Sequence, residues 1–206
     1  MQHLPDKLYT VDSVVQLEQI AINQFGIPAY ELMQRAGEAV FNIIQSKFPE
    51  CKKILILCGA GNNAGDGYVV ASLAKQAGLD TSVVSLIDPA SLKGAASQAY
   101  QHWSRFAENH DANFSVIESS DLIVDALLGT GLARDVSPTW QEWIRYINQS
   151  SKIVISVDVP SGLYANTGAI AGECINANHT VSFIGLKQGM FTSQAKDVCG
   201  EILFDD

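Results

Sequence analysis

The chain has 206 residues, with 13 Lys and Arg against 22 Asp and Glu, which gives a formal net charge of −9. That balance argues against a nucleic-acid-binding protein, because such proteins neutralise phosphates with a basic face. Hydrophobic residues make up 47% of the chain, with 16 Gly and 6 Pro, so a disordered or collagen-like chain is excluded as well. The length, residues 1–206, predicts a single domain with a buried core.

The four cysteines lack the paired spacing of a zinc site and are too few for a disulfide-rich scaffold. The sequence therefore predicts reduced, mostly buried thiols. It shows neither the basic and apolar pattern of a signal peptide nor an apolar run of the ~20 residues that span a bilayer. We expect a soluble, cytoplasmic protein that binds neither nucleic acid nor membrane.

The predicted elements change type along the chain. Apolar residues recur at helical spacing over 11–25 and 28–47, which predicts two amphipathic helices in residues 1–50. From residue 52 onward, short runs rich in Val and Ile alternate with helical segments. The predicted strands are Ile54–Cys58, Thr81–Leu86, Leu122–Ala126, Ile153–Val157 and Thr180–Phe183, with Phe114–Ile117 as a weaker candidate. The predicted helices between them are Asp66–Gln76, Ser91–Asn109 and Thr139–Ser150.

This alternation predicts an α/β fold. Strands that are apolar on both faces are typical of a parallel sheet covered by helices on each side, and short connections imply right-handed crossovers. We expect a doubly wound, mostly parallel sheet formed by residues 51–206. The helices of residues 1–50 would pack on a face or edge of that sheet, or support a dimer contact. Ligands of such sheets bind outside the carboxyl ends of the strands.

The first of these strand ends carries the glycine-rich sequence GAGNNAGDG, residues 59–67. Glycine permits positive φ and close backbone approach, and the following helix N-terminus offers N–H groups to an anion, so a phosphate-bearing ligand is expected. The spacing matches neither the dinucleotide fingerprint G-x-G-x-x-G nor a P-loop. A plain strand-to-helix turn is the alternative, although it does not require Asn62 and Asn63. Asp66 has the alternative of a first-turn acid favoured by the helix dipole.

Two further strand ends carry carboxylates. Asp125 lies inside an apolar run, where an unpaired carboxylate is costly, so it must meet a cation, several hydrogen-bond donors or a metal. The loop after it contains Gly-Thr-Gly at 129–131, and Arg134 beyond could reach a phosphate or be an ordinary surface charge. Asp158 follows the strand 153–157 and precedes the hydroxyl of Ser161; the alternative is an acid that accepts hydrogen bonds from its own turn.

These groups are expected to converge in one crevice, because the carboxyl ends of parallel strands meet at one edge of a sheet. Asn63, Asp125 and Ser161 form an all-oxygen set with one carboxylate, which suits a weakly held monovalent ion better than Ca²⁺. The alternative is that Asp125 only accepts hydrogen bonds between neighbouring loops. Lys187 follows the last predicted strand at the same rim, where it could balance a carboxylate or bind phosphate.

Four motifs in this order closely resemble the NAD(P)H-hydrate epimerase family, of the YjeF N-terminal domain type. They are GAGNNAGDG (59–67), DALLGTG (125–131), DVPSG (158–162) and GLKQG (185–189), preceded by LMQRAG (32–37). The resemblance covers nearly the whole chain. It implies a Rossmann-like fold and an isomerase that interconverts the R and S epimers of hydrated NADH and NADPH (NADHX and NADPHX), a damaged form of the cofactor.

The resemblance also implies the residues of the site. One potassium ion per subunit would be held by Asn63, Asp125 and Ser161. The residues implied to contact the hydrated nucleotide are Asn62, Asn63, Ala64, Gly65, Asp66, Gly129, Thr130, Gly131, Leu132, Ala133, Arg134, Asp135 and Asp158. Ala64 stands where the family commonly has a second glycine, which narrows the backbone freedom there. A homodimer is implied, as is an NAD(P)HX dehydratase partner, which many bacteria fuse to this domain.

The substrate's chemistry indicates what the catalytic group must do. The hydroxyl sits on a ring carbon beside nitrogen, so protonating and expelling it leaves an iminium ion that water can attack from either face. These two reaction steps need a group that donates and then accepts a proton. Asp158 is the predicted catalytic residue, with Asp66 and Lys187 as reserves.

Two other functions fit parts of the pattern. The resemblance also implies that some relatives are non-catalytic nucleotide-binding or scaffold modules, but these tend to lose the loop aspartates and glycines that are present here. An NAD-linked dehydrogenase is disfavoured by the glycine spacing and by the lack of a convincing hydride-transfer constellation.

Overall fold

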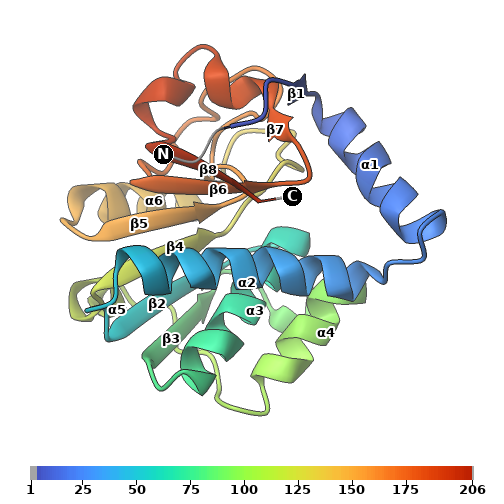
Figure 1. The fold of residues 1–206 in the computed structure, drawn as a ribbon. Helices are drawn as coiled ribbons and strands as arrows, with labels where there is room; N and C mark the ends of the chain where they lie inside the picture. Colours follow the sequence, from blue (N-terminus) through green and yellow to red (C-terminus); the bar gives the residue numbers. More distant parts are fainter. Residues whose placement is uncertain (1–3, 206) are drawn as a thin grey trace.

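The computed structural model describes residues 4–205 and is built on a parallel sheet of six strands (Figure 1). The strand order is β3-β2-β4-β5-β6-β8, and every neighbouring pair is parallel. The strands are β2 (Lys53–Cys58), β3 (Asp80–Ser85), β4 (Leu122–Ala126), β5 (Ile153–Val157), β6 (His179–Phe183) and β8 (Glu201–Asp205). The chain first adds β3 on one side of β2 and then β4 on the other, so the topological switch point lies between β2 and β4.

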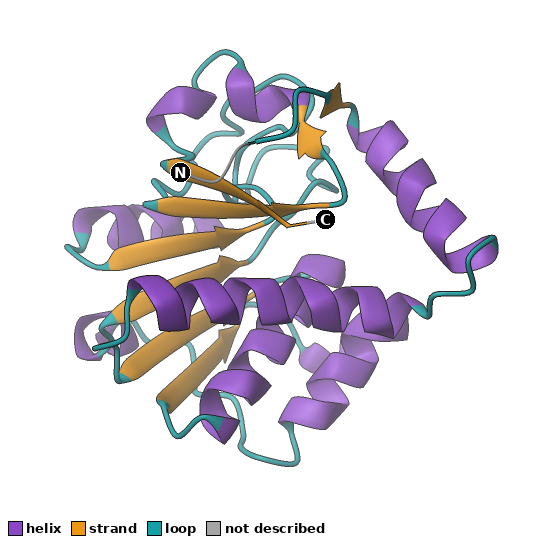
Figure 2. Cartoon of the chain, viewed as in Figure 1, coloured by secondary structure: helices purple, strands orange, loops and turns teal. Residues whose placement is uncertain are grey.

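Helices cover both faces of this sheet (Figure 2). One face carries α2 (Ala29–Lys47), α3 (Asn62–Gln76) and α4 (Gly94–Trp103), and the other carries α5 (Ser115–Ser119) and α6 (Pro138–Gln149). Strand β2 shows why helices are needed on both faces, because its apolar side chains point alternately to each. Ile54 and Ile56 belong to the core under α2–α4, whereas Leu55 and Leu57 belong to the core under α6, as the two-residue period of a strand requires. The predicted Rossmann-like α/β fold is confirmed.

Short elements complete the fold. The 3₁₀ helices are η1 (Pro89–Ser91), η2 (Gln188–Phe191) and η3 (Ala195–Asp197). A separate two-stranded parallel sheet pairs β1 (Leu8–Tyr9) with β7 (Leu186–Lys187). A third core cluster forms beyond β5 and includes Leu163, Met190 and Cys199. None of the helices within residues 4–205 is both long and apolar enough to cross a bilayer.

The predicted helices and strands need four corrections. Phe114–Ile117 is not a strand, because the Asn113 side chain accepts the Ser115 N–H at 2.9 Å and the short helix α5 follows. Helix α3 begins at Asn62 rather than Asp66. The predicted helix 91–109 is shorter than expected: η1 ends at Ser91, and α4 begins only at Gly94, at positive φ, and ends at Trp103. Strand β8 was not predicted, since only its central three residues are apolar.

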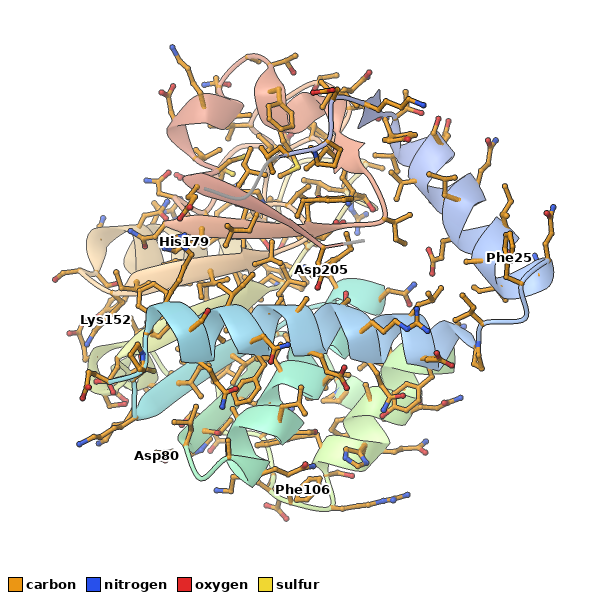
Figure 3. The ribbon with its side chains drawn as sticks, in the orientation of Figure 1. Phe25, Asp80, Phe106, Lys152, His179 and Asp205 are labelled. Carbon is orange, nitrogen blue, oxygen red and sulfur yellow. The ribbon has the colours of Figure 1, made fainter. Side chains whose placement is uncertain are left out.

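The N-terminal segment crosses the carboxyl edge of the sheet. Helix α1 (Val11–Asn23) is anchored at its start, where Tyr9 pairs with Lys187 and the Val11 N–H donates to Asn166 Oδ1 at 2.8 Å. In Figure 1, α1 then runs beyond the carboxyl ends of the strands toward α2, and Phe25 lies at its far end in Figure 3. Of residues 11–23, Val14 is buried. This segment is therefore an arm over the edge where ligands of such sheets bind.

Candidate functional site

The loops after β2 and β4 touch at the switch point. The Gly59 N–H donates to the Ala126 carbonyl at 3.1 Å, and a Cβ on Gly59 would lie 1.9 Å from the Leu127 carbonyl oxygen. Only glycine permits this approach. Gly61, with φ of +76°, then turns the chain into α3. The glycine-rich sequence therefore brings the N-terminus of α3 against the loop that follows Asp125.

Asn63, in the first turn of α3, is buried with both polar atoms of its amide unpaired. Neither Oδ1 nor Nδ2 has a hydrogen-bond partner among residues 4–205. The side chain packs against the second loop, because a Cβ on Gly129 would lie 3.3 Å from its Cγ. Leaving a buried amide unpaired costs about 1–3 kcal/mol, so this group calls for a ligand.

Asp125 is fully buried and heavily hydrogen-bonded. Its carboxylate accepts hydrogen bonds from the hydroxyl of Ser156 at 2.8 Å, the backbone N–H and hydroxyl of Ser161 at 2.9 and 2.5 Å, and the N–H of Leu127 at 3.3 Å. Burial raises the pKa of this carboxyl, and the hydrogen bonds from Ser161 and Ser156 offset part of that rise. The structure thus brings Asp125 and Ser161 together, as predicted, and shows that Asp125 does accept hydrogen bonds from neighbouring loops.

The oxygen atoms around Asp125 fit a monovalent cation. The unpaired Asn63 Oδ1, the Asp125 carboxylate and the Ser161 hydroxyl supply one formal negative charge, and the Leu128 carbonyl lies 3.2 Å from Ser161 Oγ. Within residues 4–205 no group of three or more His, Cys, Asp or Glu side chains could hold a metal ion. An ion with little charge and a preference for oxygen therefore suits these residues better than a divalent or thiophilic one.

Asp158 ends β5 in a strained conformation. Its φ is +69°, and the Val159 N–H donates to the Val157 carbonyl at 2.9 Å, which closes a three-residue γ-turn around it. The Asp158 N–H donates to the Val181 carbonyl of β6 at 2.7 Å. A non-glycine residue at positive φ is uncommon and typical of functional sites. The turn is not the self-capping turn considered as the alternative, because the Asp158 carboxylate is bound elsewhere.

Lys187 is the partner of that carboxylate. The ammonium group is buried and donates to Asp158 Oδ1, to Ser182 Oγ at 3.1 Å and to the Phe183 carbonyl at 3.0 Å. A lone lysine at a strand end is usually solvated, and this one is not. Of the two roles considered for Lys187, the structure shows that it balances a carboxylate.

Two more carboxyl groups lie in the field of this pair. Burial raises the pKa of Asp66 well above its ordinary value, the charges of Asp158 and Glu18 raise it further, and Lys187 partly offsets them. Burial also raises the pKa of Glu18, with a further contribution from Asp158. Asp66 lies in the second turn of α3, so its interpretation as a first-turn acid is wrong. Glu18 of α1 was missed, because nothing in an amphipathic helix marks which of its acids will face a distant strand end.

The remaining predicted contact residues differ in exposure. Ala64 and Gly65 are buried, so any contact they make with a nucleotide would be through the backbone at the start of α3. In the second loop Gly131, Ala133, Arg134 and Asp135 are exposed, and Gly129, Thr130 and Leu132 are half-buried. Asp135 accepts a hydrogen bond from the Tyr164 hydroxyl at 3.3 Å. Contact of these residues with a nucleotide stays a prediction.

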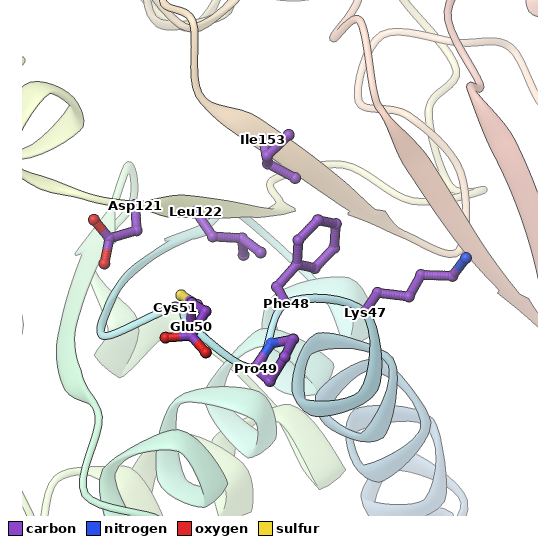
Figure 4. Close-up of a pocket in the computed structure, with 8 residues that line it drawn as sticks. All are labelled: Lys47, Phe48, Pro49, Glu50, Cys51, Asp121, Leu122 and Ile153. Carbon is purple, nitrogen blue, oxygen red and sulfur yellow. The ribbon is translucent and has the colours of Figure 1, made fainter.

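A pocket of about 340 Å³ lies at the opposite, amino end of the sheet (Figure 4). Apolar side chains form much of its wall, among them Phe48, Leu122 and Ile153. Asp121 at its edge accepts hydrogen bonds from the N–H groups of Lys52 and Lys53 at 2.9 and 2.8 Å. This pocket holds neither the unpaired polar atoms nor the strained backbone that mark the carboxyl edge, so we place the candidate site at the latter.

A Rossmann-like sheet with a glycine-opened switch point and an Asp158–Lys187 ion pair at its carboxyl edge places this chain among the doubly wound α/β proteins. The comparisons narrow this class. Residues 29–189 match the family described as YjeF-related protein N-terminus, and the chain belongs to that family. The crystal structure of yeast ynu0, YNL200c, superposes with a TM-score of 0.80 at 22% identity, covering 90% of this chain and 83% of the yeast chain, which shows the same fold.

The alignments with curated relatives cover nearly the whole of this chain. The Bifunctional NAD(P)H-hydrate repair enzyme Nnr of Escherichia coli is 42% identical over 98% of this chain, and that of Vibrio cholerae is 46% identical over 97%. This chain covers only 39% and 40% of those two proteins. The NAD(P)H-hydrate epimerase of Legionella pneumophila is 32% identical over 97% of this chain and 77% of its own length.

Proposed function

We propose that this chain is an NAD(P)H-hydrate epimerase, an isomerase that interconverts the R and S epimers of NADHX and NADPHX. The names of the Legionella and E. coli relatives support the substrate class. The observation that carries the proposal is the carboxyl edge itself, where the strained Asp158 meets the buried Lys187 beside an Asp66 of raised pKa.

The reaction needs a proton donor and a proton acceptor at one ring carbon. Loss of the protonated hydroxyl as water gives an iminium ion, and a water molecule that adds to the other face must give up a proton. Asp158 remains our catalytic residue, because Lys187 holds its carboxylate by charge and hydrogen bonding. A carboxyl of raised pKa, such as Asp66, is suited to supply the proton to the leaving hydroxyl.

The negative dinucleotide would be bound without a basic surface. The first-turn N–H groups of α3, the Gly-Thr-Gly loop at 129–131 and Arg134 are the proposed phosphate contacts. Potassium, one ion per subunit, is the proposed cofactor, held by Asn63, Asp125 and Ser161. It would supply positive charge beside these loops without any redox or proton chemistry of its own.

The second candidate function is a non-catalytic nucleotide-binding or scaffold module of the same fold. The presence of Asn63, Asp125, Asp158 and Lys187 together weighs against it, since a binding module has no need of a buried lysine paired with a carboxylate in a strained turn. We further propose a cytoplasmic homodimer that works with an NAD(P)HX dehydratase. This chain covers 39% and 40% of two bifunctional relatives, and the rest of each relative is long enough to hold a second enzyme of that kind.

The deciding experiment mixes this chain with both epimers of NADPHX and a dehydratase that acts on one of them. An epimerase makes both epimers disappear at an accelerated rate. A binding module leaves half of the material to decay at the slow spontaneous rate. Running the same assay in sodium and in potassium salts tests the cofactor separately.

A further inference from the structure

Ile184 follows β6 in a backbone conformation that isoleucine rarely adopts. Its φ is +65°, and the Gly185 N–H donates to the Phe183 carbonyl at 2.6 Å, which closes a second γ-turn next to the one at Asp158. A β-branched residue at positive φ is a genuine outlier, and glycine would hold the same turn without strain. Ile184 is 37% exposed, so burial in the core does not account for isoleucine here.

This turn is joined to the Asp158–Lys187 pair. The Phe183 carbonyl that accepts the Gly185 N–H also accepts the Lys187 ammonium at 3.0 Å. The residue after Ile184 is covered, because a Cβ on Gly185 would lie 2.8 Å from the ring of Tyr9. Ile184 is therefore the side chain that the turn leaves at the surface, within one residue of the carbonyl that holds the lysine.

The loops that directly follow the strands of the six-stranded sheet offer a ligand few exposed apolar side chains. Among the described residues, the other exposed large hydrophobic side chains lie on β1 and α1, at Phe25, and at Phe106, Tyr146 and Phe191. Of these exposed large hydrophobic residues, Ile184 is the one that lies in a loop directly after a strand of the six-stranded sheet. Ligand sites are lined mainly by apolar groups with a few placed polar ones, and a reduced, hydrated pyridine ring is uncharged and needs such a wall.

We propose that Ile184 is a specificity-determining residue whose side chain packs against the hydrated nicotinamide ring and strengthens its binding beside Asp158. This inference rests on the proposed function. On this proposal the backbone strain is retained because the γ-turn leaves an exposed apolar side chain at the carboxyl edge while its first carbonyl holds Lys187. An uncharged ring is favoured over a pyridinium cation, which would lose hydration beside an apolar side chain and a lysine.

The test uses Ile184→Gly and Ile184→Asn, which both tolerate positive φ and differ in backbone freedom, with Ile184→Val as the conservative variant. Ser193→Gly is the matched control, since Ser193 is exposed, has φ of +53° and lies in the loop between η2 and η3. We expect Ile184→Gly and Ser193→Gly both to raise the Tm. We expect only the Gly and Asn variants of Ile184 to raise the KM for NADPHX, by about fivefold or more, with kcat changed less than about threefold.

A KM within about twofold of wild type in both Ile184→Gly and Ile184→Asn would overturn the inference, as would a fall in Tm for Ile184→Gly. An unchanged KM in Ile184→Val together with the expected rise in the other two supports it. Calorimetric binding of NADPH and NADP⁺ is measured in parallel. If the wild type binds NADPH but does not accelerate epimer exchange, the proposed function fails, and the loss of NADPH affinity in the Ile184 variants still decides whether this side chain contacts the ring.

Discussion

Asp121 and Asp125 stand at opposite ends of β4, and the pKa values of their carboxyl groups are shifted in opposite directions. Asp121, at the amino edge, is exposed and accepts two backbone N–H groups, from Lys52 and Lys53, which lower its pKa. Asp125, at the carboxyl edge, is fully buried, and burial raises its pKa in spite of four hydrogen bonds. The charged form of Asp121 is favoured, whereas that of Asp125 is disfavoured although four hydrogen bonds reach it.

The same contrast holds along both edges of the sheet. At the amino edge the Glu201 carboxylate lies 2.8 Å from Lys47 and 3.0 Å from His179, and its pKa is lowered. At the carboxyl edge the pKa values of Asp66 and Glu18 are raised, and Asn63 is buried unpaired. A ligand is therefore needed at the carboxyl edge and not at the amino edge. The unpaired amide and the raised pKa values at the carboxyl edge destabilise the unliganded protein. A bound cation and nucleotide would supply the missing interactions.

The largest expected effect comes from removing the acid–base group at this edge. Asp158→Asn should reduce the rate of epimer exchange by about 10²–10⁴-fold, because the amide neither accepts nor donates the proton that the reaction moves. NADPH binding, measured by calorimetry, should stay close to wild type. Asp121→Asn is the control at the other edge and should leave the rate unchanged. A near-normal rate in Asp158→Asn would remove Asp158 from the mechanism.

Much of this edge could be predicted from sequence, because parallel strands with apolar faces have only one place to bind ligands. Asp125 inside an apolar run indicated a buried carboxylate, and the strand–loop order brought it to Ser161, as the structure confirms. The helix start at Asn62 was missed because glycine and asparagine have low intrinsic helix propensity, and the capping turn at Gly61 outweighs that here.

The features that could not be predicted are set by long-range contacts. The γ-turns at Asp158 and Ile184 have no local signature, since neither residue favours positive φ strongly. Burial of Lys187 depends on the turn at Ile184, which lets its ammonium group return to Ser182 and Phe183 of β6. Glu18 reaches the site only because β1 pairs with β7 and carries α1 across the sheet edge. Sequence patterns report on single elements, and these residues depend on how elements meet.

The second effect concerns stability. Asp125→Ala should lower the free energy of unfolding by about 3 kcal/mol, because it leaves the hydroxyls of Ser156 and Ser161 and the N–H of Ser161 buried without this acceptor. Asp121→Ala should cost less than about 1 kcal/mol, since water can replace an exposed acceptor. Urea unfolding of both variants measures the difference. Equal losses would contradict the contrast between the two ends of β4.

Potassium extends this test. If the ion binds at Asn63, Asp125 and Ser161, potassium chloride should raise the Tm of the wild type above its value in sodium chloride at equal ionic strength, because a ligand of the native state stabilises it. Asn63→Ala and Asp125→Ala should both abolish that difference. A potassium effect that survives both substitutions would place the ion elsewhere.

A smaller effect is expected in the pH dependence of stability. The folded-state pKa of Asp66 is raised, so its contribution to stability is full below the unfolded pKa and is lost as the pH rises through the folded value. Asp66→Asn should therefore gain stability relative to wild type, by about 1 kcal/mol, as the pH increases. Asp121→Asn should show the opposite trend, because its pKa is lowered and its stabilisation is lost as the pH falls. Unfolding curves across the acid range measure both slopes.

The smallest effect should come from Glu18, whose charge acts on Asp66. Its carboxylate raises the pKa of Asp66, so Glu18→Gln should lower that pKa and move the alkaline limb of the kcat/KM profile toward lower pH. Asp12, at the start of the same helix, is exposed, and Asp12→Asn is the matched control that should leave the profile unmoved. High salt should shrink the Glu18 shift less than it would shrink one between surface charges, since both carboxyl groups are partly buried. A profile unmoved by Glu18→Gln would show that the arm formed by α1 does not tune the acid at this edge.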